Sequence, residues 1–339
     1  MTNTPRAIDV LRRLEAQSEN DSVPRGDLLL WIFAICHPLL LREERVALTL
    51  QVLGEMTVEE IARAFLVPEA TIAKRIRSAR RRLIERDVPF ELPAAEELPA
   101  RLESALEVIY LVFNEGYTAS GGDEWMRPEL CAQALRWGRT LAERLPAEPE
   151  VHGLVALMAL QASRIRARVG PSGQAVLLPE QDRSLWDAEL VQSGLASLIR
   201  GEELARGRRG PYLLQAAIAA CHARARSAAE TDWERIVALY AALAERAPSP
   251  IVELNRAVAI GMAFGPEAAL ELVDRLAEEP SLLEYPFLPS VRADLLARLG
   301  RFAEARVEIE RALPRVRNAR DRALLLERLA SYARHGLPS

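Results

Sequence analysis

The chain has 339 residues, of which 50% are hydrophobic and 27% are charged, the ordinary balance of a folded globular protein. This composition excludes a disordered or collagen-like chain. The net charge of −4 gives no general attraction for nucleic acid, so a nucleic-acid site has to come from local clustering of basic residues.

Neither cysteine chemistry nor a membrane segment is indicated. The three cysteines lack the C-x-x-C spacing of zinc ribbons and fit a reducing cytoplasm. The longest apolar run covers residues 28–41 and is interrupted at His37-Pro38, whereas a membrane span requires about 20 residues. We therefore expect a buried core helix in this run and a cytoplasmic protein without a membrane partner.

Helical periodicity runs through almost the whole sequence, and the alternation typical of strands is scarce. Recurrent Pro and Gly mark short connections between helices. The sequence predicts an all-α fold in four parts. These are a short N-terminal segment over 1–26, a helical domain over 27–90, a Pro- and Glu-rich linker over 91–100 and an array of helical hairpins over 101–335.

The C-terminal part contains a degenerate repeat. Ala257 and Ala293 are 36 residues apart, as are Ala269 and Ala305, close to the period of about 34 of tetratricopeptide repeats. Small residues recur where paired helices approach closely. Two interpretations stay open: a concave face that binds a peptide or a regulatory partner, or a scaffold that only packs on its neighbour.

The strongest local pattern lies between residues 54 and 83. Thr57 and Glu60 form a capping box that begins one helix, and Pro68 suits the first turn of the next. The second helix is predicted over 68–86, and one stripe of it is apolar. Two short helices joined by a tight turn are typical of a helix-turn-helix. The stripe consists of Ile72, Ile76, Ala79 and Leu83.

The second helix also concentrates the positive charge of the chain. Residues 68–86 hold seven basic and two acidic residues, while residues 94–339 hold 30 basic and 34 acidic ones. A helix fits the major groove, where arginine can donate two hydrogen bonds to guanine. We predict base contacts from Lys74, Arg77 and Ser78. The predicted phosphate contacts are Thr71, Arg75, Arg80 and Arg81.

At these residues the chain resembles region 4 of extracytoplasmic-function (ECF) sigma factors of the sigma-70 family. The resemblance is carried by MTVEEIARAFLVPEATIAKRIRSARRRL and the preceding LLLWIFAICHPLLLREERVALTLQVLGE. The chain is also similar to the subgroup with a C-terminal helical-repeat (TPR-like) extension. The segments that carry this narrower match are DVPFELP, YLVFNEGYTAS, DRSLWD, GPYLLQAAIAACHA and TDWERIVALY.

The resemblance implies promoter recognition. It implies that the second helix reads the −35 element and that region 4 docks on the β-flap of core RNA polymerase. Ala73 stands where such helices often carry a basic residue, so the resemblance does not imply which exact −35 sequence this helix reads. By this resemblance we expect region 2, which melts the −10 element in this family, to be largely missing, because only PRAIDVLRR at residues 5–13 resembles its last helix. Three interpretations stay open: a fragment of a longer sigma factor, a misassigned start codon, or a natural lone region 4 with its extension. We expect weak binding and no transcription initiation by this polypeptide alone.

Three other clusters favour structural roles. We expect no metal at Cys36-His37 or Cys221-His222, because nothing in the sequence brings these pairs together. Residues 113–120, with Gly121 and Gly122, are predicted to form a helix junction. Residues 181–187 are predicted to form an ion-pair network in which Arg183 meets flanking carboxylates.

The sequence contains no phosphate-binding glycine motif. A catalytic carboxylate pair at Asp182 and Asp187 is conceivable, but no histidine partner is nearby in the sequence. We therefore expect no enzyme, no catalytic residue and no cofactor. The alternative to the sigma-factor hypothesis is a TPR-like peptide-binding adaptor whose helix-turn-helix is vestigial. A further hypothesis is that the acidic extension packs near residues 68–86 and gates them.

Overall fold

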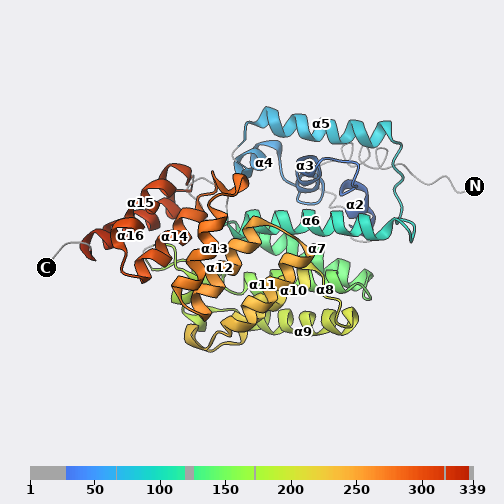
Figure 1. Ribbon diagram of the computed structural model, residues 1–339. Helices are drawn as coiled ribbons and strands as arrows, with labels where there is room; N and C mark the ends of the chain where they lie inside the picture. The colour runs from blue at the N-terminus through green and yellow to red at the C-terminus, as the bar shows by residue number, and fades with distance from the viewer. Residues whose placement is uncertain (1–27, 66, 119–125, 172, 317, 336–339) are drawn as a thin grey trace, which may run out of the picture. The chain divides into compact units, whose positions relative to one another are not determined.

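The computed structural model describes residues 28–65, 67–118, 126–171, 173–316 and 318–335 (Figure 1). Within these ranges the chain forms α-helices, short 3-10 turns and an isolated bridge between Val169 and Ala175, and it forms no β-strand. The predicted all-α fold is confirmed. Among the described helices, none is long and apolar enough to cross a membrane. The segment at residues 5–13 and the glycines at 121 and 122 lie outside the described ranges.

The chain divides into two compact units. The first comprises residues 1–120 and 126–146, and the second comprises residues 121–125 and 147–339. The helices of the first unit are α2 (Leu28–Ile35), α3 (Arg42–Val52), α4 (Val58–Phe65), α5 (Glu69–Glu85), α6 (Leu98–Tyr117) and α7 (Pro128–Arg144).

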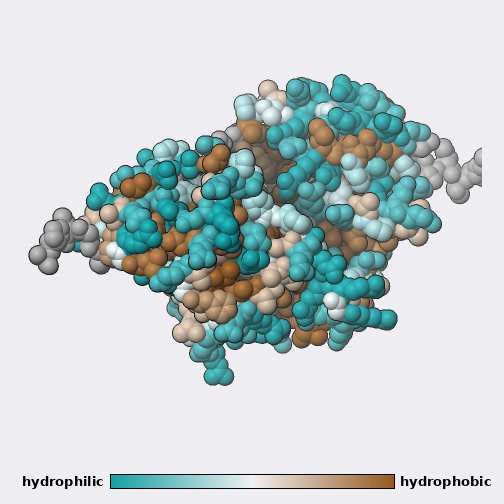
Figure 2. Space-filling model, in the orientation of Figure 1, coloured by the Kyte–Doolittle hydropathy of each residue, from teal (hydrophilic) through white to brown (hydrophobic). Residues whose placement is uncertain are grey.

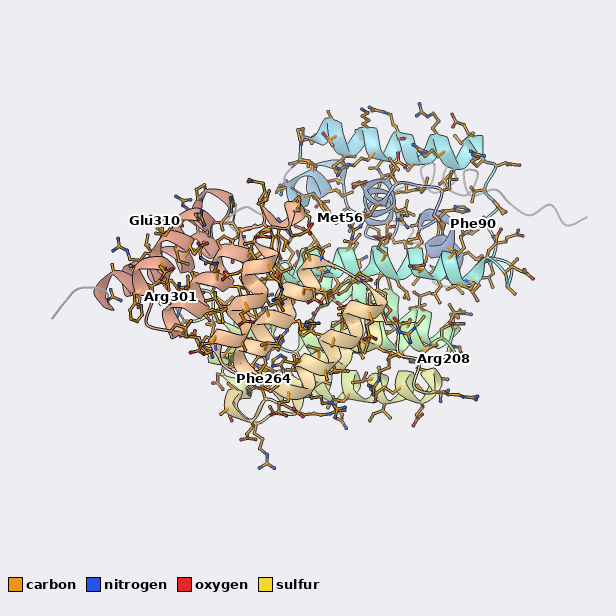
Figure 3. The ribbon with its side chains drawn as sticks, viewed as in Figure 1. Met56, Phe90, Arg208, Phe264, Arg301 and Glu310 are labelled. Atoms are coloured by element: carbon orange, nitrogen blue, oxygen red, sulfur yellow. The ribbon has the colours of Figure 1, made fainter. Side chains whose placement is uncertain are left out.

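In the first unit, α2, α3 and α4 lie between α5 on one side and α6 with α7 on the other (Figure 1). The expected core helix is α2, which ends at Ile35, just before His37-Pro38. Its Trp31 is buried and meets the ring of Phe90 edge-on at 4.7 Å between ring centroids. Phe90, labelled in Figure 3, thereby ties the segment after α5 back onto α2.

The compact units do not divide at the expected linker over 91–100. Helix α6 begins at Leu98, and it packs on α2 and α3, while α7 packs on α6 and α2. The reason is the burial of apolar side chains, since one long face of α6 is buried from Leu102 to Phe113. The segment over 91–100 is therefore a connection inside the first unit, and the N-terminal unit extends to residue 146.

The second unit is a succession of helices, each from α10 to α16 packing against the next. The members are α8 (Pro149–Ala162), α9 (Ala188–Ala205), α10 (Pro211–Arg224), α11 (Trp233–Arg246), α12 (Pro250–Ala263), α13 (Pro266–Leu276), α14 (Phe287–Arg298), α15 (Phe302–Ala312) and α16 (Ala319–His335). Many begin with proline, whose missing N–H is no loss in the first turn of a helix.

The 36-residue spacing of alanines corresponds to a repeated helix pair. Ala257 and Ala269 lie on α12 and α13, and Ala293 and Ala305 lie on α14 and α15. All four are fully buried. A side chain larger than a methyl group would hold these helices further apart, so the repeated alanines set the close packing of the array.

Candidate nucleic-acid interface

The first helix of the helix-turn-helix begins as its sequence predicts. The amide of Thr57 donates to the Glu60 carboxylate at 2.8 Å, and the amide of Glu60 donates to Oγ1 of Thr57 at 3.1 Å. These two bonds are the reciprocal pair of a capping box, which satisfies amides that have no partner within the helix. The hydroxyl and amide of Thr57 also hold the pKa of the exposed Glu60 carboxyl below its usual range.

The second helix is anchored by its apolar stripe. Pro68 directly precedes α5, and its extended backbone (φ −59°, ψ 143°) ends the turn. Ile72, Ile76, Ala79 and Leu83 are each no more than 5% exposed. Because these residues recur every three or four positions, their burial leaves the opposite side of α5 in solvent. The predicted stripe is confirmed.

Three basic residues occupy the outer side of α5. Lys74, Arg77 and Arg81 are exposed, and Figure 2 shows hydrophilic side chains gathered over this helix. Arg81 lies 3.8 Å from the Glu85 carboxylate, with both side chains more than 60% exposed. Such a surface pair is worth little, so it leaves Arg81 able to exchange its partner.

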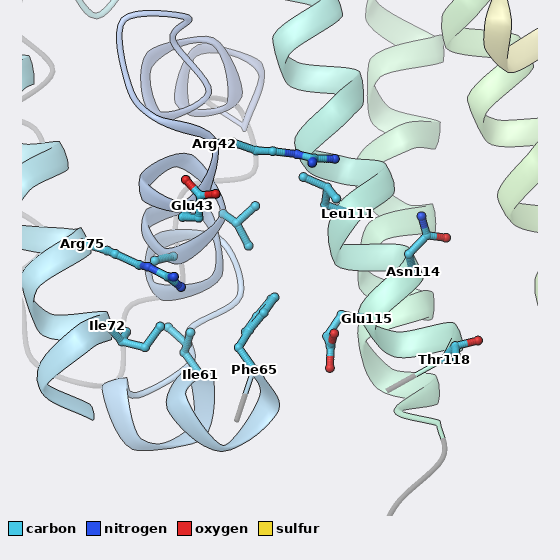
Figure 4. A pocket seen from close by; sticks show the side chains of 12 residues that line it. Arg42, Glu43, Ile61, Phe65, Ile72, Arg75, Leu111, Asn114, Glu115 and Thr118 are labelled. Atoms are coloured by element: carbon cyan, nitrogen blue, oxygen red, sulfur yellow. The ribbon is translucent and has the colours of Figure 1, made fainter. Parts of the chain in front are cut away.

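The other predicted DNA contacts are less exposed than these three. Thr71, Arg75 and Ser78 are half-buried along the flanks of α5. Arg75 points from α5 toward α3, as Figure 4 shows.

Arg80 was predicted to contact a phosphate, but its side chain does not lie on the exposed side of α5. Its guanidinium turns inward and donates to Oε1 of Gln51 on α3 at 2.9 Å. Burial lowers the pKa of this half-buried guanidinium, although arginine stays charged in proteins. Arg82 also turns toward α3, with its Nε 3.3 Å from the buried Glu44 carboxylate. Two of the seven basic residues over 68–86 therefore hold α5 to α3.

A cavity of about 290 Å³ lies beside α5, among α3, α4 and α6 (Figure 4). Its walls are mostly apolar and include Ile61, Phe65 and Leu111. The polar residues on its border include Arg75 and Glu115. No local pattern in the sequence predicts this cavity, because its walls come from helices that include residues far apart in the chain.

Two side chains, Arg127 just before α7 and Gln133 on α7, donate to the ends of α4 and α3. Nη1 of Arg127 donates to the carbonyl oxygen of Ala64 at 3.1 Å, and Nε2 of Gln133 donates to the carbonyl oxygen of Leu53 at 2.7 Å. Arg127 also pairs with the buried Glu115 carboxylate at 2.7 Å. Sequence reasoning missed Arg127 and Gln133, because neither belongs to a motif near residues 54–83.

The segment over 113–120 continues the helix further than predicted. Residues 113–117 belong to α6, and the rings of Phe113 and Tyr117 stack with their centroids 5.8 Å apart. Gly116 is helical rather than part of a loop. A Cβ there would lie 2.7 Å from the carbonyl oxygen of Arg127, so glycine permits the close approach of α7.

The cluster over 181–187 is not the predicted ion-pair network. Nη1 of Arg183 donates to the carbonyl oxygens of His222 and Ala225, and its guanidinium lies 4.8 Å from the ring centroid of Trp186. Asp182 and Asp187 instead accept backbone amides at the beginnings of helical turns. Backbone carbonyls at the end of α10 were not visible as partners in the sequence.

The two Cys-His pairs belong to different compact units. Burial raises the pKa of the Cys36 thiol to about 12, and its sulfur lies 3.6 Å from Oγ1 of Thr49. Burial lowers the pKa of His222 to about 4, and its ring meets Trp233 edge-on. No group of three His, Cys, Asp or Glu side chains suited to a metal is found in the described ranges.

Comparison with known protein families agrees with this geometry. Residues 36–83 match the family described as "Sigma-70, region 4", which covers α3, α4 and nearly all of α5. The chain therefore contains a sigma-70 region 4 domain and is related to the sigma-70 family. Residues 101–201 match a family of unknown function (DUF6596), which begins in α6 and ends in α9 and so includes helices of both units.

A relative matches over most of the chain. "Uncharacterized protein R00370" of Rhizobium meliloti (strain 1021) is 44% identical over 310 residues, covering 91% of this chain and 72% of the relative. The chain belongs to the same protein family as this relative.

Proposed function

We propose that the protein is a sigma factor of the extracytoplasmic-function type that recognises the promoter −35 element through α5. The observation that carries the proposal is the division of α5 into a buried apolar stripe and an exposed basic side. A helix held by one face can enter the major groove with the other. The region 4 match covers the same helices.

The roles divide according to exposure. Lys74 and Arg77 are exposed one turn apart and are assigned to base edges, with Ser78 beside them. Thr71, Arg75 and Arg81 are assigned to phosphates on the two walls of the groove. Arg80 links α5 to Gln51 on α3 and is not assigned to DNA.

The test is equilibrium binding to a duplex that carries the promoter −35 element, measured by fluorescence anisotropy at several salt concentrations. If Arg75 and Arg81 neutralise about two phosphates, log K should fall against log salt with a slope of about −2. Lys74→Ala and Arg77→Ala should each weaken binding by about 1–3 kcal/mol. Arg246→Ala and Arg306→Ala, which remove exposed arginines from the second unit, are the matched controls. Equal affinity for all four variants would refute the proposal.

The proposal includes core RNA polymerase as a partner, through its β-flap, because region 4 domains of this family dock there. It also includes the second unit as a TPR-like regulatory extension. The repeated helix pair with buried alanines supports this assignment. A pull-down of core polymerase by the full chain, compared with the Lys74→Ala variant, separates polymerase docking from DNA reading.

A second candidate is a peptide-binding adaptor. A hollow of about 480 Å³ lies among α13, α14 and α15, bordered by Arg292, Arg311 and Arg315. Arg292 and Arg311 both donate to the buried Glu308 carboxylate, at 2.8 and 3.0 Å. The adaptor hypothesis predicts that replacing Lys74, Arg75 and Arg77 by alanine changes no function. The sigma-factor hypothesis predicts loss of promoter binding.

A further inference from the structure

The region 4 domain receives side-chain donors at the ends of two of its helices, α3 and α4. Leu53 follows the last residue of α3, and Ala64 lies in the last turn of α4. The final carbonyl groups of a helix have no partner within it and need one from elsewhere. Gln133 supplies the donor to Leu53, and Arg127 supplies the donor to Ala64. Both donors belong to residues 126–146, outside the region 4 match.

Arg127 is itself fixed in place. Its side chain is 12% exposed and pairs with Glu115, which is 5% exposed, at 2.7 Å. Its backbone amide donates to the carbonyl oxygen of Gly116 at 2.7 Å. Arg127 is therefore bound to the end of α6 at two points, and its guanidinium cannot shift unless the α6–α7 hairpin shifts with it.

The position of Ala64 gives this contact a consequence for α5. Ala64 lies four residues before Pro68, which directly precedes α5. A displacement at the end of α4 is therefore passed through a short turn to the beginning of the basic helix. A cation at this carbonyl also stabilises the negative end of the α4 dipole.

We propose that Arg127 is a positioning residue for DNA recognition: it ties the α6–α7 hairpin to the turn of the helix-turn-helix and so sets the angle of α5. The inference rests on the proposed function of α5. It assigns to the hairpin, which begins the match to the family of unknown function, the task of holding the DNA-reading helix in register.

Arg101 provides a matched comparison within the same hairpin. It is buried, and its Nη2 donates at 2.7 Å to the carbonyl oxygen of Phe33 on α2. Arg101 and Arg127 thus make the same kind of bond from the same hairpin. Arg101 donates to a carbonyl oxygen of α2, and Arg127 donates to one at the end of α4. A general effect on folding should follow from the loss of either bond, whereas an effect on the angle of α5 should follow from the loss of Arg127 alone.

The variants are chosen to avoid a lone buried carboxylate, which would unfold the chain. Glu115→Gln removes the charge but keeps an acceptor for Arg127. The double variant Glu115→Gln/Arg127→Met then removes the bond to Ala64. Arg101→Met is the matched control, and Arg127→Lys, which can still donate to Ala64, is the conservative rescue.

The measurements are affinity for a −35 duplex and hydrogen exchange of the full chain over residues 60–65 and 67–72. We expect the double variant to bind about tenfold more weakly than Glu115→Gln and to exchange faster in these segments. Arg101→Met and Arg127→Lys should stay within about threefold of the unsubstituted chain. Equal weakening by Arg101→Met and the double variant, or no weakening by the double variant, overturns the inference.

Failure of the proposed function has a separate signature. If the unsubstituted chain does not bind the duplex, the assignment of α5 to DNA fails. The link between Arg127 and the end of α4 is then tested by hydrogen exchange alone. Faster exchange in the double variant but not in Arg101→Met then supports the link. Unchanged exchange in the double variant overturns it.

Discussion

Cutting the chain after residue 95 should unfold the helix-turn-helix domain, although every residue of the region 4 match is retained. The cut removes α6 and α7, which pack on α2 and α3. Trp31, Phe33 and Ile35 on α2 are each no more than 1% exposed in the intact unit. Removing α6 and α7 opens the side of α2 and α3 on which they pack.

The expected loss is comparable with the whole stability of a domain. Fully burying a large apolar side chain contributes about 1.5–3 kcal/mol. Exposing apolar surface equal to two or three such side chains would remove about 3–9 kcal/mol, against a typical total of about 5–15 kcal/mol. The carbonyl groups of Phe33, Leu53 and Ala64 would also lose their donors, but water can replace those bonds.

The assay is thermal unfolding by circular dichroism, with residues 1–146 as the matched fragment. The longer fragment retains the whole first compact unit and should unfold cooperatively. Residues 1–95 should show weak helicity and no cooperative transition. A cooperative transition of the shorter fragment at the same temperature would refute the reasoning and would restore a domain boundary near residue 95.

Three further outcomes are expected. Gly116→Ala should lower the free energy of unfolding by about 1–3 kcal/mol, because the new Cβ would lie 2.7 Å from the carbonyl oxygen of Arg127; thermal unfolding measures it, and an unchanged midpoint would contradict it. Thr57→Ala should lower it by about 1 kcal/mol through loss of the cap, with Thr140→Ala, at a half-buried mid-helix position of α7, as control. His222 has a pKa lowered by burial from 6.5 to about 4, so the unfolded state binds the proton first as the pH falls. Stability should therefore fall between about pH 6.5 and 4, by at most about 1.4 kcal/mol per pH unit, and His222→Gln should show a shallower pH dependence in denaturant titrations.

The helix-turn-helix could be predicted because its signals are local. A capping box, a proline at the turn and an apolar repeat act within a few residues of one another, so sequence spacing translates directly into geometry. The cap at Thr57 and the buried stripe from Ile72 to Leu83 were confirmed on these grounds. The direction of each arginine was less predictable, because a long side chain near the edge of the stripe can turn either way. Arg80 turns inward because Gln51 on α3 offers it an acceptor.

The sequence by itself determined that the chain is helical, where the two helices of the helix-turn-helix begin and which helix carries the positive charge. Those properties depend on residues within one or two turns of each other. Only the tertiary structure decided that α6 and α7 belong with region 4 and that Arg127 reaches the end of α4. An apolar face requires a helix to pack against another element, but it does not select which one, because the hydrophobic effect is non-directional.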